Sequence, residues 1–246
     1  QTHGTANRLI SLTLKIVTMT ILEWTICKTP IKLYVCWLVY TKMKKMQSEN
    51  LYIGDDKFQR FLDHYQCPTP LQVVKLKFAG AICSPNNNLR PTDVISSLFP
   101  EDKQPRLTTK AEAELFFKFF MGLWDEMFEI IQTNTLELPV MTAKDKKDLG
   151  AFCLMRAEQV ERGFVEGFWG GCESLNIPQF AAELINSLSD MAGVYEMLAK
   201  KLEKAEDPED ISEVIKHTDK TVEKTFKFLI KNLILPNIAK LQRQLN

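Results

Sequence analysis

From residue 55 onward, apolar side chains recur every three or four positions, which is the period of one face of an α-helix. The widest such stripe begins after Thr109 and carries phenylalanine, leucine, methionine and tryptophan as far as Ile131. Comparable stretches run over about residues 70–83, 142–168, 176–201 and 207–235. We therefore predict an all-α fold, a bundle of five to eight helices, completed by short helices at about 55–65 and 92–98.

Signals at the ends of these stretches support this prediction. Thr69 and Thr109 are each followed three residues later by a glutamine or a glutamate, the spacing of a capping box at a helix start. Thr142 offers a third start. The Gly-Gly pair at 170–171 indicates a helix end, and Pro236 interrupts the last apolar stretch.

The beginning of the chain has a different pattern. β-branched and aromatic residues cluster at 9–26 and 31–40, which predicts a β-prone or disordered segment rather than an amphipathic helix. Our interpretation is that the protein starts near Met43 or Met46 and that the preceding residues are non-native upstream sequence. The alternative is an amino-terminal β-hairpin or an exposed hydrophobic arm. We therefore expect an atypical segment at 1–45 and a helical domain at 46–246.

Charge adds little to this picture. The chain has 246 residues, and its 31 Lys and Arg balance its 31 Asp and Glu, so we expect no nucleic-acid partner. Residues 1–49 hold seven basic side chains against two acidic ones, yet their longest uncharged run is the nine residues 33–41. A transmembrane helix needs about 18 or more mostly apolar residues, so we expect no membrane partner.

The chain offers little metal or redox chemistry. Its six cysteines form no CxxC pair, and its three histidines are scattered. His64 and Cys67 have ligand spacing, but no second pair accompanies them. We expect reduced thiols in a cytoplasmic protein, with no metal and no cofactor.

Catalytic motifs are also missing. The sequence contains no phosphate-binding glycine loop, no HExxH and no GxSxG. Glutamates at 158, 161 and 166 share a predicted helix with Arg156 and Arg162. A solvated, salt-bridged helix face explains this group more simply than an acid–base pair, so we predict a protein that is not an enzyme.

Two glycines on the same predicted helix point to packing. Gly163 and Gly167 lie one turn apart on one face, and each costs about 1 kcal/mol of helix stability relative to alanine. We expect the close approach of another helix to compensate for this cost.

The last predicted helix has two notable features. Lysines at 216, 220, 224, 227 and 231 line one face, which we interpret as a mixed-charge solvent face because Glu213, Asp219 and Glu223 interleave with them. Phe226, Phe228 and the apolar residues 233–235 would be hard to bury within a monomer. We therefore predict a helix–helix interface with a second copy.

Three short segments resemble a known family. Residues 78–85 (FAGAICSP), a Leu-Phe-Pro turn at 98–100 and residues 162–167 (RGFVEG) are similar to motifs of the YecA/YgfB-like family of bacterial proteins. The resemblance covers about residues 58–239. Val160 stands where the family has a tryptophan, and the cysteine-rich zinc motif of the longer members is missing, so the chain is nearer the short members.

The resemblance implies an all-α cytoplasmic protein that is dimeric, has no known catalytic residues and, in some members, binds regulatory proteins. We predict a non-enzymatic interaction or regulatory module that forms a homodimer and binds an unidentified protein partner. The alternative is a small-ligand-binding protein or an enzyme, with a pocket between helices near residues 80–85 and 163–171. Candidate interaction or close-packing residues are Gly80, Pro85, Gly163, Phe164, Gly167, Phe228 and Leu233.

Overall fold

The computed structural model describes residues 52–86, 88–139, 146–203 and 208–236. Within these ranges the chain forms helices joined by loops and contains no strand, which confirms the predicted all-α fold. The expectations for residues 1–45 and for the helix start at Thr142 lie outside the described residues.

The helices follow the predicted apolar stretches closely. The first part of the described chain contains α3 (Asp55–His64), α4 (Leu71–Cys83), α5 (Pro91–Ser96), the short 3₁₀ helix η1 (Glu101–Lys103) and α6 (Lys110–Gln132). The second part contains α7 (Lys146–Glu158), η2 (Gln159–Val165), α8 (Glu166–Trp169), α9 (Gln179–Glu203), α10 (Pro208–Leu229) and η3 (Ile230–Ile234). Both η2 and η3 are π-helical, and each continues the α-helix before it without a break.

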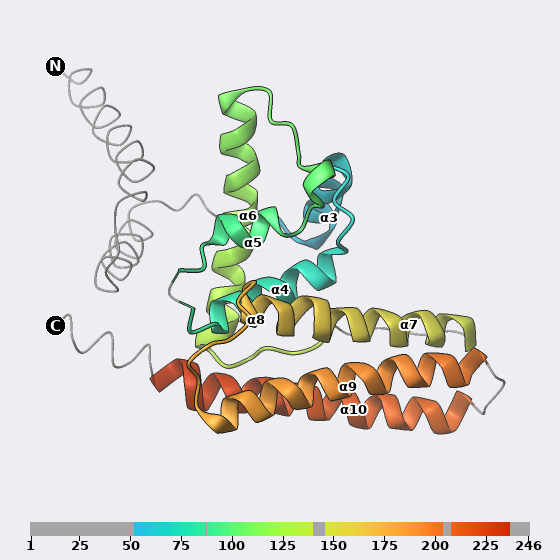
Figure 1. Ribbon diagram of the computed structural model, residues 1–246. Coiled ribbons are helices and arrows are strands. Elements are labelled where there is room, and N and C mark those ends of the chain that lie inside the picture. The colour runs from blue at the N-terminus through green and yellow to red at the C-terminus, as the bar shows by residue number, and fades with distance from the viewer. Residues whose placement is uncertain (1–51, 87, 140–145, 204–207, 237–246) are drawn as a thin grey trace, which may run out of the picture. The chain divides into compact units, whose positions relative to one another are not determined.

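The arrangement of these helices is visible in Figure 1. α9 packs against both α7 and α10, and the three helices lie side by side. α4 crosses the far end of the α7–η2–α8 helix, where it packs on η2 and α8, and it also packs on α3, α5 and α6. α4 is therefore the element that joins the two parts of the core.

The aromatic stripe on α6 lies in the core, as predicted. Phe116 and Phe120 are buried, and their ring centroids lie 4.9 Å apart. The ring of Phe58 meets Phe120 edge-on at 5.4 Å. Such tilted and edge-on pairs are the arrangement that aromatic rings favour. The stripe thus fixes α3 against α6.

The helix ends follow the predicted signals in part. Thr109 caps α6 by accepting a hydrogen bond from the backbone N–H of Glu112 at 3.1 Å, but the Glu112 carboxylate accepts from the N–H of Thr108 instead of Thr109. The box predicted at Thr69 is wrong. α4 starts one residue later than that box requires, with Pro70 as its N-cap, and the Thr69 hydroxyl donates to the carbonyl of Leu98 at 3.0 Å.

Candidate functional site

The glycines singled out from the sequence meet where α4 crosses η2 and α8. Gly80 on α4 faces the backbone of Phe164 and Phe168, and Gly167 on α8 faces the backbone of Lys77. A Cβ atom placed on Gly80 would lie 2.8 Å from the Phe168 nitrogen, and one on Gly167 would lie 3.0 Å from the carbonyl carbon of Lys77. Only glycine allows the two helix backbones to come this close.

Gly163 takes part in the same crossing. A Cβ atom there would lie 3.0 Å from the Cβ of Leu76 and 3.2 Å from the carbonyl oxygen of Val73. The close approach predicted from the spacing of Gly163 and Gly167 is therefore present at both positions. The room that these glycines leave is filled by the neighbouring helix.

The neighbouring candidates Phe164 and Pro85 also belong to this region. Phe164 is fully buried, and its ring lies 4.4 Å from that of Phe226 on α10. Pro85 is partly buried in the loop after α4. The next residue of that loop, Asn86, donates its side-chain N–H to the sulfur of Cys172 at 3.2 Å, beyond the end of α8. The loop and the turn are thereby held together.

The helix ends at the Gly-Gly pair 170–171, as the sequence predicts. Gly170 is the C-cap of α8 and has a left-handed backbone with φ of 55°. A residue with a Cβ atom is strained in this conformation, so glycine suits the position.

A polar cluster is buried between α7, η2, α9 and α10. The Arg156 guanidinium donates to the Gln159 side-chain oxygen at 2.8 Å, to the Pro139 carbonyl at 2.7 Å and to the Asp219 carboxylate at 3.0 Å. The Tyr195 hydroxyl donates to the other Asp219 oxygen at 2.5 Å. Burial, and then the bond to Asp219, raise the pKa of Tyr195, so the phenol stays protonated.

The position of Arg156 corrects the sequence-based interpretation of this helix. We expected a solvated charged face, whereas Arg156 is only 2% exposed and stacks over the Phe152 ring at 4.8 Å. The expectation holds for Arg162, which is exposed and pairs with Glu158 at 3.4 Å. The position along the helix distinguishes Arg156 from Arg162. Arg156 lies four residues after Phe152 and four before Val160, which places it on the apolar side.

The apolar end of the chain is also placed differently from our prediction. Phe226 and Leu233 are buried within the monomer, so Leu233 is not available to a partner. The π-helical segment η3 follows Leu229 directly, and Ile230, Leu233 and Ile234 all lie on its buried side. Phe228 alone among the predicted interface residues is well exposed, at 53%.

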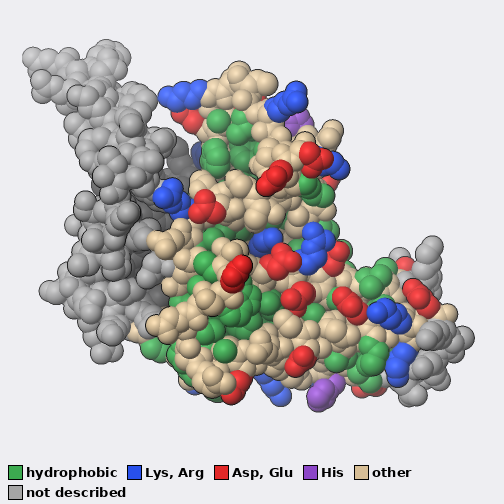
Figure 2. Space-filling model, in the orientation of Figure 1, with side chains coloured by type: hydrophobic (Ala, Val, Ile, Leu, Met, Phe, Trp, Pro, Cys, Tyr) green, Lys and Arg blue, Asp and Glu red, His purple; other side chains and the backbone are tan. Residues whose placement is uncertain are grey.

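A second aromatic ring accompanies Phe228 at the surface. Phe180, in the first turn of α9, is 36% exposed, and its ring centroid lies 6.5 Å from that of Phe228. In the space-filling view, hydrophobic side chains over the α9–α10 pair lie among acidic and basic ones (Figure 2). Phe180 was not among the sequence candidates, because only the packing of α9 on α10 brings the two rings together.

The lysine stripe on α10 is less balanced by acidic residues than the sequence indicates. Asp219 is engaged by Arg156 and Tyr195, and the Glu223 carboxylate accepts a hydrogen bond from the backbone N–H of Leu138 at 3.1 Å. Two of the three interleaved carboxylates thus serve the interior. Glu213 remains outside and pairs with Lys216 at 2.7 Å.

Residues 52–86, 88–139, 146–203 and 208–236 contain neither a metal site nor a membrane-spanning helix. No group of three or more His, Cys, Asp or Glu side chains in these ranges is arranged to hold a metal ion. No helix among them has the length and apolar character needed to cross a membrane. No protein-family model, no curated protein and no solved structure matches this chain.

Proposed function

We propose that this chain is a non-enzymatic protein-interaction module that works as a dimer, and that Phe180 and Phe228 lie in its interaction surface. The observation that carries this proposal is the pair of neighbouring aromatic rings left exposed on α9 and α10. Large aromatic side chains are enriched at the centres of protein interfaces. Burying these two rings in an interface would stabilise the complex by about 25 cal/mol for each Å² of apolar surface removed from water.

Two further observations and the family resemblance support the proposal. Four of the five charged residues considered for acid–base chemistry have structural partners, since Arg156 bonds Asp219, Arg162 pairs with Glu158, and Glu166 pairs with Lys77 at 3.2 Å. The same kind of role is implied by the resemblance to the YecA/YgfB-like family. The four described cysteines are free thiols, which suits the cytoplasm as the place of action.

Light scattering on the full chain tests this proposal. We expect the wild type to have twice the chain mass of 28.3 kDa, and Phe228→Ser to shift toward the monomer. Leu154→Ser is the matched control, because Leu154 is equally exposed, at 52%, but lies on α7. Circular dichroism would verify that both variants are folded. A wild type that stays at the monomer mass up to high concentration would contradict the proposed dimer.

A further inference from the structure

The outward face of α10 and η3 carries a row of lysines at 216, 220, 224, 227 and 231. Lys220, Lys224 and Lys231 are exposed and form no ion pair with another described residue. The interleaved Asp219 and Glu223 are used in the interior, as described above. Because Arg156 neutralises Asp219, the five lysines of the row outnumber the remaining interleaved carboxylates, Glu213 and Glu223, and the face keeps an excess of positive charge.

α9 presents a stripe of different character. Phe180 and Met197 are exposed apolar residues near its two ends, and Glu183 and Asp190 are exposed carboxylates between them. Successive members of this group are three, seven and seven residues apart, and this spacing keeps all four on one side of the helix. Asp190 makes no ion pair with another described residue. The outward side of α9 is thus acidic in the middle and apolar at the ends.

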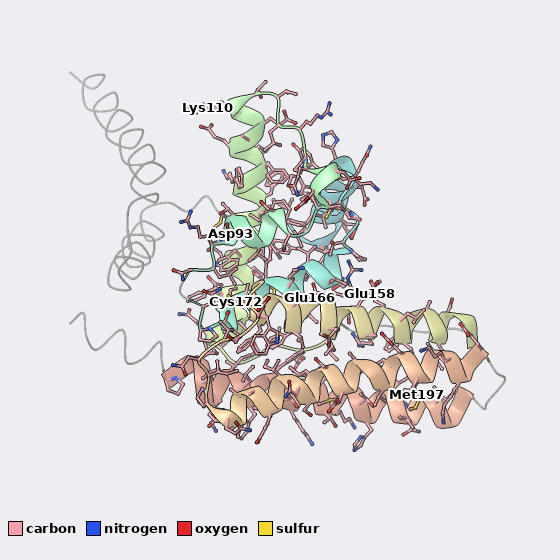
Figure 3. All side chains as sticks on the ribbon, in the orientation of Figure 1. Asp93, Lys110, Glu158, Glu166, Cys172 and Met197 are labelled. Atoms are coloured by element: carbon pink, nitrogen blue, oxygen red, sulfur yellow. The ribbon has the colours of Figure 1, made fainter. Side chains whose placement is uncertain are left out.

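The antiparallel packing of α9 on α10 combines these two stripes into one face. Phe180 contacts Phe228 at one end, and Tyr195 bonds Asp219 further along the pair. Residues of the two helices are therefore matched in reverse order, which places Met197 (Figure 3) and the exposed Val214 toward the same end of the helix pair. The composite face has an apolar pair at each end, carboxylates on one helix and lysines on the other.

We propose that a second copy of this chain docks on the α9–α10 face, with its α9 over the first copy's α10, about a two-fold axis parallel to the helices. This proposal rests on the proposed function and names the surface that the dimer uses. In this arrangement the aromatic ends of the two copies meet, and Glu183 and Asp190 of each copy face the lysine row of the other. Lys220 and Lys224 lie opposite Asp190.

The charges select this arrangement over the other two-fold packing of the same face. An axis perpendicular to the helices would stack α9 on α9 and α10 on α10, so that lysines face lysines and carboxylates face carboxylates. Like charges placed opposite each other across an interface cost several kcal/mol. A two-fold interface uses the same patch on both copies, so each ion pair occurs twice.

Charge reversal on the full chain provides the test. One variant carries Lys220→Glu and Lys224→Glu, and a second carries Glu183→Lys and Asp190→Lys. In a dimer of either variant alone, like charges face each other wherever α9 of one copy lies over α10 of the other. We therefore expect the dissociation constant measured by sedimentation to rise at least about tenfold. An equimolar mixture restores every pairing, and we expect a heterodimer. Lys103→Glu with Lys118→Glu, at exposed lysines on η1 and α6, is the control with equal change in charge.

The outcomes separate this inference from the proposed function. A wild-type monomer contradicts the dimer itself. A wild-type dimer that Phe228→Ser dissociates, but that both charge-reversed variants retain, leaves the proposed function standing and overturns the paired arrangement. If only the lysine variant raises the dissociation constant, the lysines pair with residues other than Glu183 and Asp190, and the arrangement is again wrong. Formation of a heterodimer in the equimolar mixture of the two charge-reversed variants supports the paired arrangement.

Discussion

At the scale of single residues, the same amino acid has opposite effects in different places. Gly167 lies against the backbone of Lys77, whereas a Cβ on Gly150 of α7 would meet no atom within 4 Å beyond its chain neighbours and the backbone of its own helix. Helix propensity favours alanine over glycine at both positions by about 1 kcal/mol. Only the neighbour distinguishes them, so the glycine at 167 reflects packing rather than flexibility.

This difference predicts opposite outcomes for one substitution. Gly167→Ala should lower the free energy of unfolding by about 1–3 kcal/mol, because its methyl group overlaps backbone atoms that cannot move aside. Gly150→Ala should raise the free energy of unfolding by up to about 1 kcal/mol. Urea unfolding followed by circular dichroism would measure both. A Gly167→Ala variant as stable as the wild type would show that the helices at this crossing can separate without cost.

Residue type alone also failed to place Arg156. An arginine on a helix that also carries several glutamates is normally a solvent residue, and the sequence analysis predicted a solvated position for it. Its burial depends on Asp219, which lies 63 residues later, and on the carbonyl of Pro139. Local spacing indicates that Arg156 lies on the apolar side of its helix, but it cannot identify partners this distant in sequence, which is why the buried polar cluster was missed.

At the scale of elements, the helix from α7 to α8 depends on its π-helical middle. Gln159, Val160, Gly163, Phe164 and Val165 are all buried in η2. An ordinary α-helix has 3.6 residues per turn and presents fewer consecutive residues to one side. The wider turn lets η2 face both α9 and α4. π-Helical segments have no simple sequence signature, so periodicity predicted the helix but not this feature.

Deleting one residue tests this role. Removing the exposed Arg162 would take the extra residue out of the wide π-helical turn, so the segment would become α-helical while α8 keeps its orientation. Gly167 would stay against α4, but η2 would present one residue fewer to α4 and α9, and we expect a fall in the melting temperature. Arg162→Ala is the control, and it removes only the exposed pair with Glu158, which is worth about 0.5 kcal/mol. A deletion as stable as this control would contradict the structural role of η2.

At the scale of the whole molecule, the sequence predicts the fold better than the candidate site. Apolar periodicity predicts α4, α6, α9 and α10 within a few residues, because each is long and has one buried face. The surface of α9 and α10 depends on how the two helices pair, and residues such as Phe180 and Phe228 are 48 positions apart. Packing, rather than local pattern, decides which apolar residues remain outside.

The core as a whole also holds several protons that an unfolded chain would release. Burial raises the pKa of the Cys83 thiol, and burial together with the nearby Asp219 carboxylate raises the pKa of the Cys153 thiol to about 11. Burial and the bond to Asp219 raise the pKa of Tyr195 in the same way. In each case the folded state binds its proton more tightly than the unfolded state does.

The direction of the resulting pH dependence follows from proton linkage. Above about pH 9 the unfolded chain loses thiol protons that the folded protein retains, so the unfolded state gains stability as the pH rises. The contribution of Cys153 is complete below about pH 9 and is lost as the pH rises through about 11. We expect the melting temperature, measured with a reducing agent present, to fall between pH 8 and 10.5. Cys153→Ala should flatten this slope, whereas Cys172→Ala, at a partly exposed thiol, should not. Equal slopes in both variants would mean that the Cys153 proton is not held by the fold.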